Sequence, residues 1–296
     1  MRRRQETAPK LLRHRSTIMG LVGVGLSVAL LTSACGPNAA AGNGENSGAS
    51  SSASGASESS SASGSGSSSA AASAGQGDLP QGSEAVKLDP AEFTTRIDNP
   101  YWPMDPGNKW VYSETDTVGT REKVVVEVTG KTKMIANGIE ARVIRDTVSE
   151  GGQPVEITDD WYAQDKAGNI WYLGEYVTNY KNGKVVDHSG SFEAGVDGAQ
   201  AGIAMPANPE PGMTYRQEYY KGEAEDKAAV ITVGEEQVQV PFGYFNKGVN
   251  MTRDLVPTEP KVQELKFYAP GVGPVLSMHT DGPGGRAALV SYTPGG

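Results

Sequence analysis

The stretch Lys123-Val124-Val125-Val126-Glu127-Val128 decides the fold class of this chain, because its side chains alternate with a period of two. In an extended strand, successive side chains face opposite sides, so Val124, Val126 and Val128 share one face. Asn137-Gly138 follows, and this dipeptide is strongly favoured in tight β-hairpin turns. Alternation resumes over residues 141–146, which indicates that two antiparallel strands flank the turn.

The same alternation recurs along the chain from Lys109 onward, with turn signals such as Asn182-Gly183 and Pro270-Gly271 between the runs. No window of about 12 residues keeps the 3.6-residue period of an amphipathic helix. We therefore predict an all-β fold, an antiparallel meander of about ten to twelve strands that forms a barrel or a curved half-barrel sheet. The further strand-like runs are Val155–Ala163, Asn169–Tyr180, Lys184–Glu193, Thr214–Tyr220, Ala228–Val240, Val249–Val256, Val262–Ala269, Val275–Thr280 and Ala287–Tyr292. The stretch Gly195–Gly212 is predicted to be a long irregular loop, a kind of segment that is often functional.

The first 37 residues resemble a bacterial lipoprotein signal. A basic segment up to Arg15 precedes an apolar run from Ile18 to Leu31, which is too short for a spanning helix of about 20 residues. The run ends in Leu30-Leu31-Thr32-Ser33-Ala34-Cys35, with small residues directly before the cysteine. The resemblance implies that residues 1–34 are a signal peptide, and that Cys35 becomes a lipidated N-terminus. Acyl chains such as palmitate would then hold the protein on the extracytoplasmic face of the cell membrane.

Two further segments follow Cys35 in this interpretation. Residues 35–86 are rich in Ser, Ala and Gly and have too few apolar side chains to form a core, so we predict a disordered tether. Residues 87–296 form a single β-rich extracytoplasmic domain. The whole chain has a formal net charge of −9, and without the basic residues 1–34 the charge becomes −14. Such an acidic product disfavours nucleic acid as a partner.

The richest cluster of side chains lies in residues 159–175, which resemble a hairpin with its turn at Asp165–Gly168. Its aromatic residues form a candidate ligand platform, to which two tyrosines of a later strand are added: Trp161, Tyr162, Trp171, Tyr172, Tyr215 and Tyr219. A purely structural role is the alternative, because cross-strand aromatic pairs stabilise a sheet by about 0.2–1 kcal/mol each.

The same hairpin carries the candidate metal ligands Asp159, Asp160 and Glu175. A three-residue turn would place Asp159 opposite Glu175, and facing carboxylates repel each other unless a cation or a proton lies between them. Ca²⁺ is the cofactor that oxygen ligands of this kind suit. The alternative is a cell-envelope hydrolase that takes a carboxylate pair from Asp159, Asp160, Glu175 and Glu218. Other enzyme signatures are absent from the sequence, and His188 and His279 are expected at the surface.

Two segments near the end of the chain, Val238–Phe245 and Phe267–Val275, are similar to recurring segments of the half-barrel lipoprotein carriers typified by LolA and LppX. Phe242, Tyr244 and Pro274 depart from the pattern of those proteins. The resemblance implies a curved antiparallel sheet with an apolar cavity for an acyl chain. The sequence thus favours a membrane-anchored, non-catalytic binding or carrier domain for an apolar or lipid ligand or an envelope component. The carboxylate-pair hydrolase and a structural or interaction lipoprotein without a small ligand are the alternatives.

Overall fold

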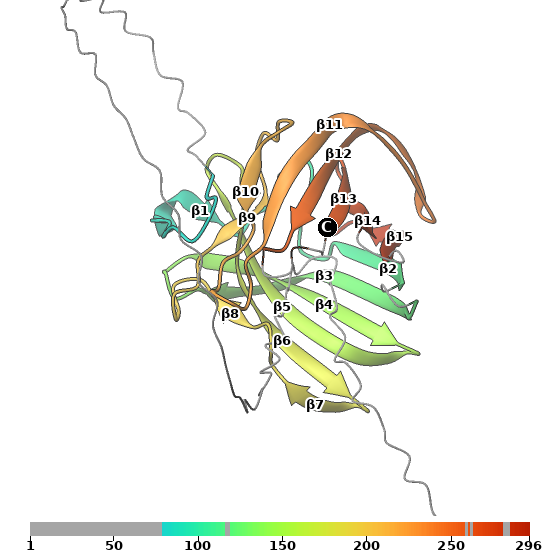
Figure 1. Ribbon diagram of the computed structural model, residues 1–296, viewed down its shortest axis with the longest axis horizontal. Coiled ribbons are helices and arrows are strands. Elements are labelled where there is room, and N and C mark those ends of the chain that lie inside the picture. Colours follow the sequence, from blue (N-terminus) through green and yellow to red (C-terminus); the bar gives the residue numbers. More distant parts are fainter. Residues whose placement is uncertain (1–78, 116–118, 258–259, 261–262, 281–284) are drawn as a thin grey trace, which may run out of the picture. The chain divides into compact units, whose positions relative to one another are not determined.

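The computed structural model in Figure 1 describes residues 79–115, 119–257, 260, 263–280 and 285–296. The predicted signal peptide, Cys35 and most of the predicted tether lie outside these residues. The described part contains strands and one 3₁₀ turn, η1 (Pro90–Glu92), and it has no helix long and apolar enough to cross a membrane. The strands are β1 (Phe93–Thr94), β2 (Lys109–Thr115), β3 (Arg121–Met134), β4 (Glu140–Glu150), β5 (Gln153–Asp165), β6 (Ile170–Lys181), β7 (Lys184–Asp187), β8 (Phe192–Glu193), β9 (Gly202–Met205), β10 (Thr214–Arg216), β11 (Lys227–Val240), β12 (Gly243–Leu255), β13 (Gln263–Ala269), β14 (Gly273–His279) and β15 (Arg286–Thr293).

All strand pairs are antiparallel, so the predicted all-β meander is confirmed. The main path of the sheet runs β10-β11-β12-β13-β14-β15-β2-β3-β4-β5-β6-β7, while β1 pairs with β5, and β8 and β9 pair with β6. The ladder is not closed into a barrel. The sheet nevertheless curls strongly, because the Trp102 ring lies 5.8 Å from that of Tyr162 on β5 and 5.9 Å from that of Tyr268 on β13. In Figure 1 the orange strands β11 and β12 accordingly arch above the green and yellow strands β3–β6.

The tight turns form where the sequence predicts them. Gly138 follows Asn137 between β3 and β4 with a φ of 87°, and Asn182-Gly183 joins β6 to β7 with φ angles of 53° and 71°. Gly151 and Gly152 have φ angles of 55° and 83° between β4 and β5. Two successive positive φ angles define a type I′ turn, whose twist matches that of the flanking strands. These turns fix the register of neighbouring strands.

The predicted loop Gly195–Gly212 is not wholly irregular, because it contains β9. This strand pairs with β6 through Trp171↔Ile203 and Tyr172↔Gly202. The isolated bridge Gln200↔Tyr219 then connects the residues before β9 to those after β10. The loop therefore connects β6, the last strand but one of the sheet path, with β10 at the opposite end. We call the contact between residues 200–202 and 216–219 the seam.

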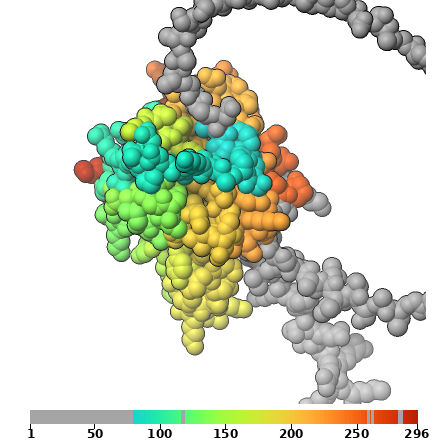
Figure 2. Space-filling model, turned by 90° about the vertical axis from the view of Figure 1, so that its left-hand side faces the viewer, coloured from blue at the N-terminus to red at the C-terminus, as the bar shows by residue number. Residues whose placement is uncertain are grey.

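Residues 79–86, which composition assigns to the tether, lie against the seam. The buried guanidinium of Arg216 donates hydrogen bonds to the carbonyl oxygens of Gly82, Glu84 and Ala201. Figure 2 shows this N-terminal segment in blue beside the yellow and orange residues around β9 and β10. One arginine thus fastens the start of the described chain to both sides of the seam.

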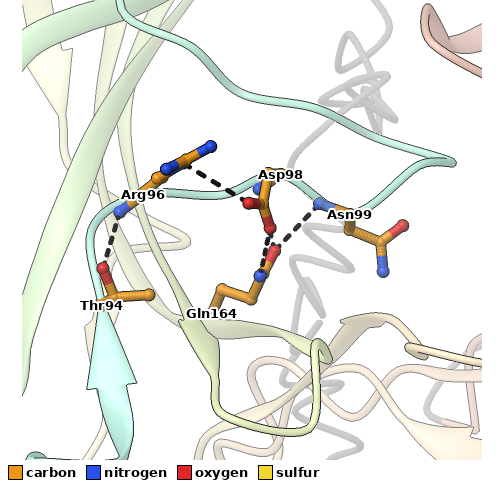
Figure 3. A network of polar contacts seen from close by, with 5 residues as sticks. All are labelled: Thr94, Arg96, Asp98, Asn99 and Gln164. Carbon is orange, nitrogen blue, oxygen red and sulfur yellow. Dashed lines mark hydrogen bonds and ion pairs between the residues drawn. The ribbon is translucent and has the colours of Figure 1, made fainter.

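The chain continues over β5 along a second set of polar contacts, shown in Figure 3. Gln164 accepts hydrogen bonds from the backbone N–H groups of Asp98 and Asn99 at 3.0 and 2.9 Å, and its amide donates to Asp98 at 2.7 Å. Arg96 forms an ion pair with the same Asp98 at 3.4 Å. Because Gln164 uses both its donor and its acceptor here, the network fixes the segment between β1 and β2, including Trp102, at one end of the sheet.

Candidate functional site

Carboxylates dominate the polar residues that the described structure buries. Ten of them are buried, against two cationic side chains, Arg216 and Lys266. They are Glu114, Glu122, Asp146, Glu156, Asp160, Glu175, Glu218, Asp226, Asp254 and Glu264. Buried charges in proteins are normally paired, so an excess of this size within a folded interior is unusual.

The strand register places several of these acids on one face. Residues that pair directly across two strands share a face, and Asp160 pairs with Glu175. Asp146 pairs with Thr158, which is two residues from Asp160, so Asp146 lies on that face too. This face is the inner one, since Tyr162 and Tyr172 at its end contact Trp102 and Phe192 in the core.

The register differs from the predicted hairpin in one respect. Tyr162 faces Tyr172 as expected, but Glu175 faces Asp160 instead of Asp159, which pairs with Tyr176. The expected pairing of Asp159 with Glu175 is therefore wrong. The cause is a β-bulge in β6 between Tyr172 and Glu175, where β6 has one residue more than the facing part of β5, so that the side chains of β6 beyond it exchange faces.

Glu218 and Asp226 come from the other end of the sheet path. Glu218 follows β10 and Asp226 precedes β11, and the backbone N–H of Gln217 donates to the carbonyl of Asp226 at 2.8 Å. The seam places these two acids at the inner face of β5 and β6. There the negative charges of Glu175 and Asp160 repel that of Glu218 and help to raise its pKa. We call Asp160, Glu175, Glu218 and Asp226 the seam cluster.

The seam cluster has fewer hydrogen-bond donors than acceptors among the described residues. Each of its four side chains is at most 1% exposed, and neither oxygen of Glu175 or of Glu218 accepts a hydrogen bond. Asp160 accepts one, from the Tyr172 hydroxyl at 2.8 Å, and its second oxygen has none. An unsatisfied buried polar group costs about 1–3 kcal/mol, and more when it is charged. The hydrogen-bond network of the cluster is therefore incomplete, because several buried carboxylate oxygens have no donor.

Burial is the main reason why the pKa values of these carboxyls are raised. It raises the pKa of Asp160 to about 7, against the opposing hydrogen bond from Tyr172, and the Glu156 and Asp159 charges add to the rise. Burial and then the Asp160 charge hold the pKa of Glu175 well above its usual range. The pKa of Glu218 is raised by burial and by Asp226. These acids therefore titrate as one coupled group instead of as independent carboxyls.

Next to the cluster, Lys266 forms buried ion pairs with Asp254 and Glu264, so this part of the interior already holds a cation. The Lys266 ammonium lies 2.8 Å from Asp254 and 3.4 Å from Glu264, and all three side chains are buried. Burial lowers the pKa of Lys266, but the two carboxylates outweigh it and raise the pKa above its ordinary value. The same ammonium opposes the burial that raises the pKa of Asp226, which places it beside the seam cluster.

The predicted aromatic platform is divided between two environments. The Tyr162 and Tyr172 rings stack at 4.9 Å on the inner face and lie near the acids, whose charges raise the pKa of both hydroxyls after burial. Trp161, Trp171 and Tyr215 belong to a second apolar cluster, and the half-buried Tyr219 lies in the seam. The six residues therefore do not form one platform, because successive strand residues face opposite sides.

The three predicted metal ligands are divided in the same way. Asp159 lies on the outer face in a two-pronged ion pair with Arg145, with both N–O distances 2.7 Å, while Asp160 and Glu175 point inward. Among the described residues, no group of three His, Cys, Asp or Glu side chains could hold a metal ion. Of the carboxylates proposed for a hydrolase, Asp160, Glu175 and Glu218 come together and Asp159 does not.

Three residues beside the seam cluster were not selected from the sequence: Asp254, Glu264 and Lys266. Asp254 and Lys266 do carry a local signal, since each stands in phase with buried neighbours on its strand, as the pairs Asp254↔Glu264 and Thr252↔Lys266 show. A charged residue at a core position of an alternating strand is the pattern that could have identified them.

Neither a family model nor a curated protein sequence matches the chain. Two solved structures are similar to it. One is a protein from Bacteroides fragilis NCTC 9343 that has a YmcC-like fold and is proposed to be exported, with 16% identity, a TM-score of 0.37, and coverage of 66% of this chain and 99% of that one. The other is a proposed lipoprotein from Parabacteroides distasonis ATCC 8503, with 14% identity, a TM-score of 0.34, and coverage of 65% of this chain and 98% of that one.

Proposed function

We propose that this protein is a lipid-anchored, extracytoplasmic binding protein whose β domain holds a cationic ligand against the seam cluster. The observation that carries the proposal is the pair Glu175 and Glu218, whose four carboxylate oxygens are buried without a hydrogen-bond donor among the described residues. A bound cation with N–H groups would supply both the missing donors and the missing charge. Non-catalytic binding is sufficient to explain this arrangement.

The same observation disfavours the acyl chain that the resemblance to half-barrel carriers implies. An acyl chain donates no hydrogen bonds, so its burial against Glu175 and Glu218 would leave both carboxyls unsatisfied. Apolar side chains do line parts of the inner face, but they alternate with acids along β4 and β5. We therefore propose a cationic ligand in place of the apolar ligand that the sequence favours.

Native mass spectrometry of the protein purified from its own host tests this function. We expect a retained cationic small molecule in the natural protein and in the Asp159→Asn variant, whose substitution lies on the outer face. We expect the molecule to be lost from the Glu175→Gln, Glu218→Gln double variant, in which both side chains keep their shape but lose the charge. Retention of a lipid, or a ligand that the double variant still holds, would show that the seam cluster does not bind the ligand.

The lipid anchor is tested separately at Cys35. Replacement by alanine removes the only thiol that can take a diacylglycerol group. We expect the Cys35→Ala protein to leave the membrane fraction and to lose the mass of the acyl groups. A variant that remains membrane-bound with unchanged mature mass would contradict the anchor.

A carboxylate-pair hydrolase is the second candidate, and one observation favours it. Asp160 and Glu175 face each other across β5 and β6, and burial raises the pKa of Asp160 to about 7, as a general acid at neutral pH requires. Its test is turnover of envelope glycans. Loss of that turnover in Asp160→Asn, with turnover unchanged in Asp159→Asn, would favour the hydrolase over the binding protein.

A further inference from the structure

We infer that the ligand of the seam cluster is a linear polyamine, a flexible aliphatic chain with two or more ammonium groups. The inference rests on the proposed function and names its ligand class. It follows from three features of the site: the spread of the carboxylates, the kind of cation that the interior already holds, and the apolar side chains between the acids.

The carboxylates are too spread for one small ion. They come from four places in the chain, β5, β6, the end of β10 and the start of β11, and no three acidic or histidine side chains in the described residues are grouped for a metal. Asp146 extends the acidic surface along β4, and both of its oxygens also lack a donor. A ligand that neutralises several separated carboxylates needs several separated positive centres.

Lys266 shows which cation the interior accommodates. Its primary ammonium is buried between Asp254 and Glu264, directly beside the seam cluster. Three N–H donors on a compact cation suit carboxylates that approach from different strands. A quaternary ammonium would supply charge without donors, so it would leave the oxygens of Glu175 and Glu218 unsatisfied.

The side chains between the acids are apolar and buried, an environment that suits the methylene groups of such a chain. Ile144 pairs with Asp160, and Val177 pairs with Thr158 in the adjacent row of the inner face. The stacked rings of Tyr162 and Tyr172 border Asp160 on its other side. Alternating acidic and apolar patches match a molecule in which ammonium groups alternate with short aliphatic spacers.

Binding is expected to depend on pH because polyamine charges must displace protons from the cluster. The charged and titratable groups around the cluster are Glu156, Tyr172, Asp254, Glu264 and Lys266, with Asp159 on the outer face of β5. All but Tyr172 and Lys266 are acids, so repulsion favours protonated carboxyls in the empty site. The pKa of Asp160 is about 7, so this carboxyl loses its proton as the pH rises from 5 to 8. A polyamine that is still charged then binds more tightly than at pH 5.

Isothermal titration calorimetry of the mature chain at pH 7.5 tests the inference with spermidine, putrescine and n-butylamine. We expect affinity to fall in that order, with spermidine at least tenfold tighter than n-butylamine. Titration in buffers with different ionisation enthalpies should show net proton release. Glu218→Gln should weaken spermidine at least about tenfold, since a buried charged hydrogen bond is lost. Glu223→Gln, an exposed acid on the same segment, should bind as the natural protein does.

The outcomes separate this inference from the function on which it rests. If no amine binds while native mass spectrometry shows another retained cation, the polyamine is wrong and the cation-binding function stands. If no cation of any kind is retained or bound, both are wrong. Equal affinity for n-butylamine and spermidine, or an equal loss of affinity in Glu218→Gln and Glu223→Gln, would also overturn the polyamine.

Discussion

Replacement of Asp160 by asparagine should stabilise the folded protein at alkaline pH. The asparagine keeps the shape of the side chain, and its amide oxygen can still accept the hydrogen bond that the Tyr172 hydroxyl donates at 2.8 Å. Its amide nitrogen takes the place of the oxygen that lacks a donor and faces the Glu175 carboxylate. The substitution thus removes a buried charge and adds a donor where one is missing.

The size and sign of the effect follow from the pKa of Asp160. Burial raises it from 3.8 to about 7, so between these pH values the folded protein binds a proton that the unfolded chain has released. The stability of the natural protein therefore falls as pH rises through this window. The difference corresponds to about 4 kcal/mol in the free energy of unfolding. Asp160→Asn should gain up to this amount at pH 8 and nothing at pH 4.

Urea unfolding at pH 4 and pH 8 measures both values. Asp159→Asn is the matched control, because Asp159 is the neighbouring residue on the outer face and forms a part-exposed ion pair with Arg145. Its effect should stay within about 1 kcal/mol at pH 8. An Asp160→Asn protein that is destabilised equally at both pH values would refute the argument, because the buried carboxyl would then be a satisfied structural group.

Two further substitutions test the interior and the seam. Lys266→Met should destabilise the protein by about 3–5 kcal/mol in urea unfolding at pH 7, because it leaves Asp254 and Glu264 buried without their cation; an effect below about 1 kcal/mol would contradict the pairing. Gly202→Ala should weaken the seam, since a Cβ atom there would lie 2.1 Å from the carbonyl oxygen of Gln217. Amide hydrogen exchange should speed up in β9 and β10 first, and uniform exchange across all strands would disagree with this prediction.

The local pattern of the sequence determined the class of the fold. Alternation in residues 123–128 and the Asn-Gly turns at 137–138 and 182–183 specify strands and hairpins, because both depend only on neighbouring residues. The same local pattern identified Asp159, Asp160 and Glu175 as acids of one hairpin. Their pairing was not identified, since a bulge in β6 between Tyr172 and Glu175 changes which side chain faces Glu175. Gly174, with a φ of 125°, lies inside this bulge. An isolated glycine in a strand is the only local signal of the bulge, and it does not by itself specify the register.

Only the tertiary structure decided what the inner face contains. The sequence shows Asp160 and Glu218 almost sixty residues apart, and each alone resembles a surface acid. The curl of the sheet and the pairing of β9 with β6 bring them into one buried cluster. Burial then changes their chemistry, because a carboxyl removed from water keeps its proton unless a cation replaces it. Residue types and their order thus determined the strands, while the contact that β9 makes between β6 and the residues after β10 determined the site.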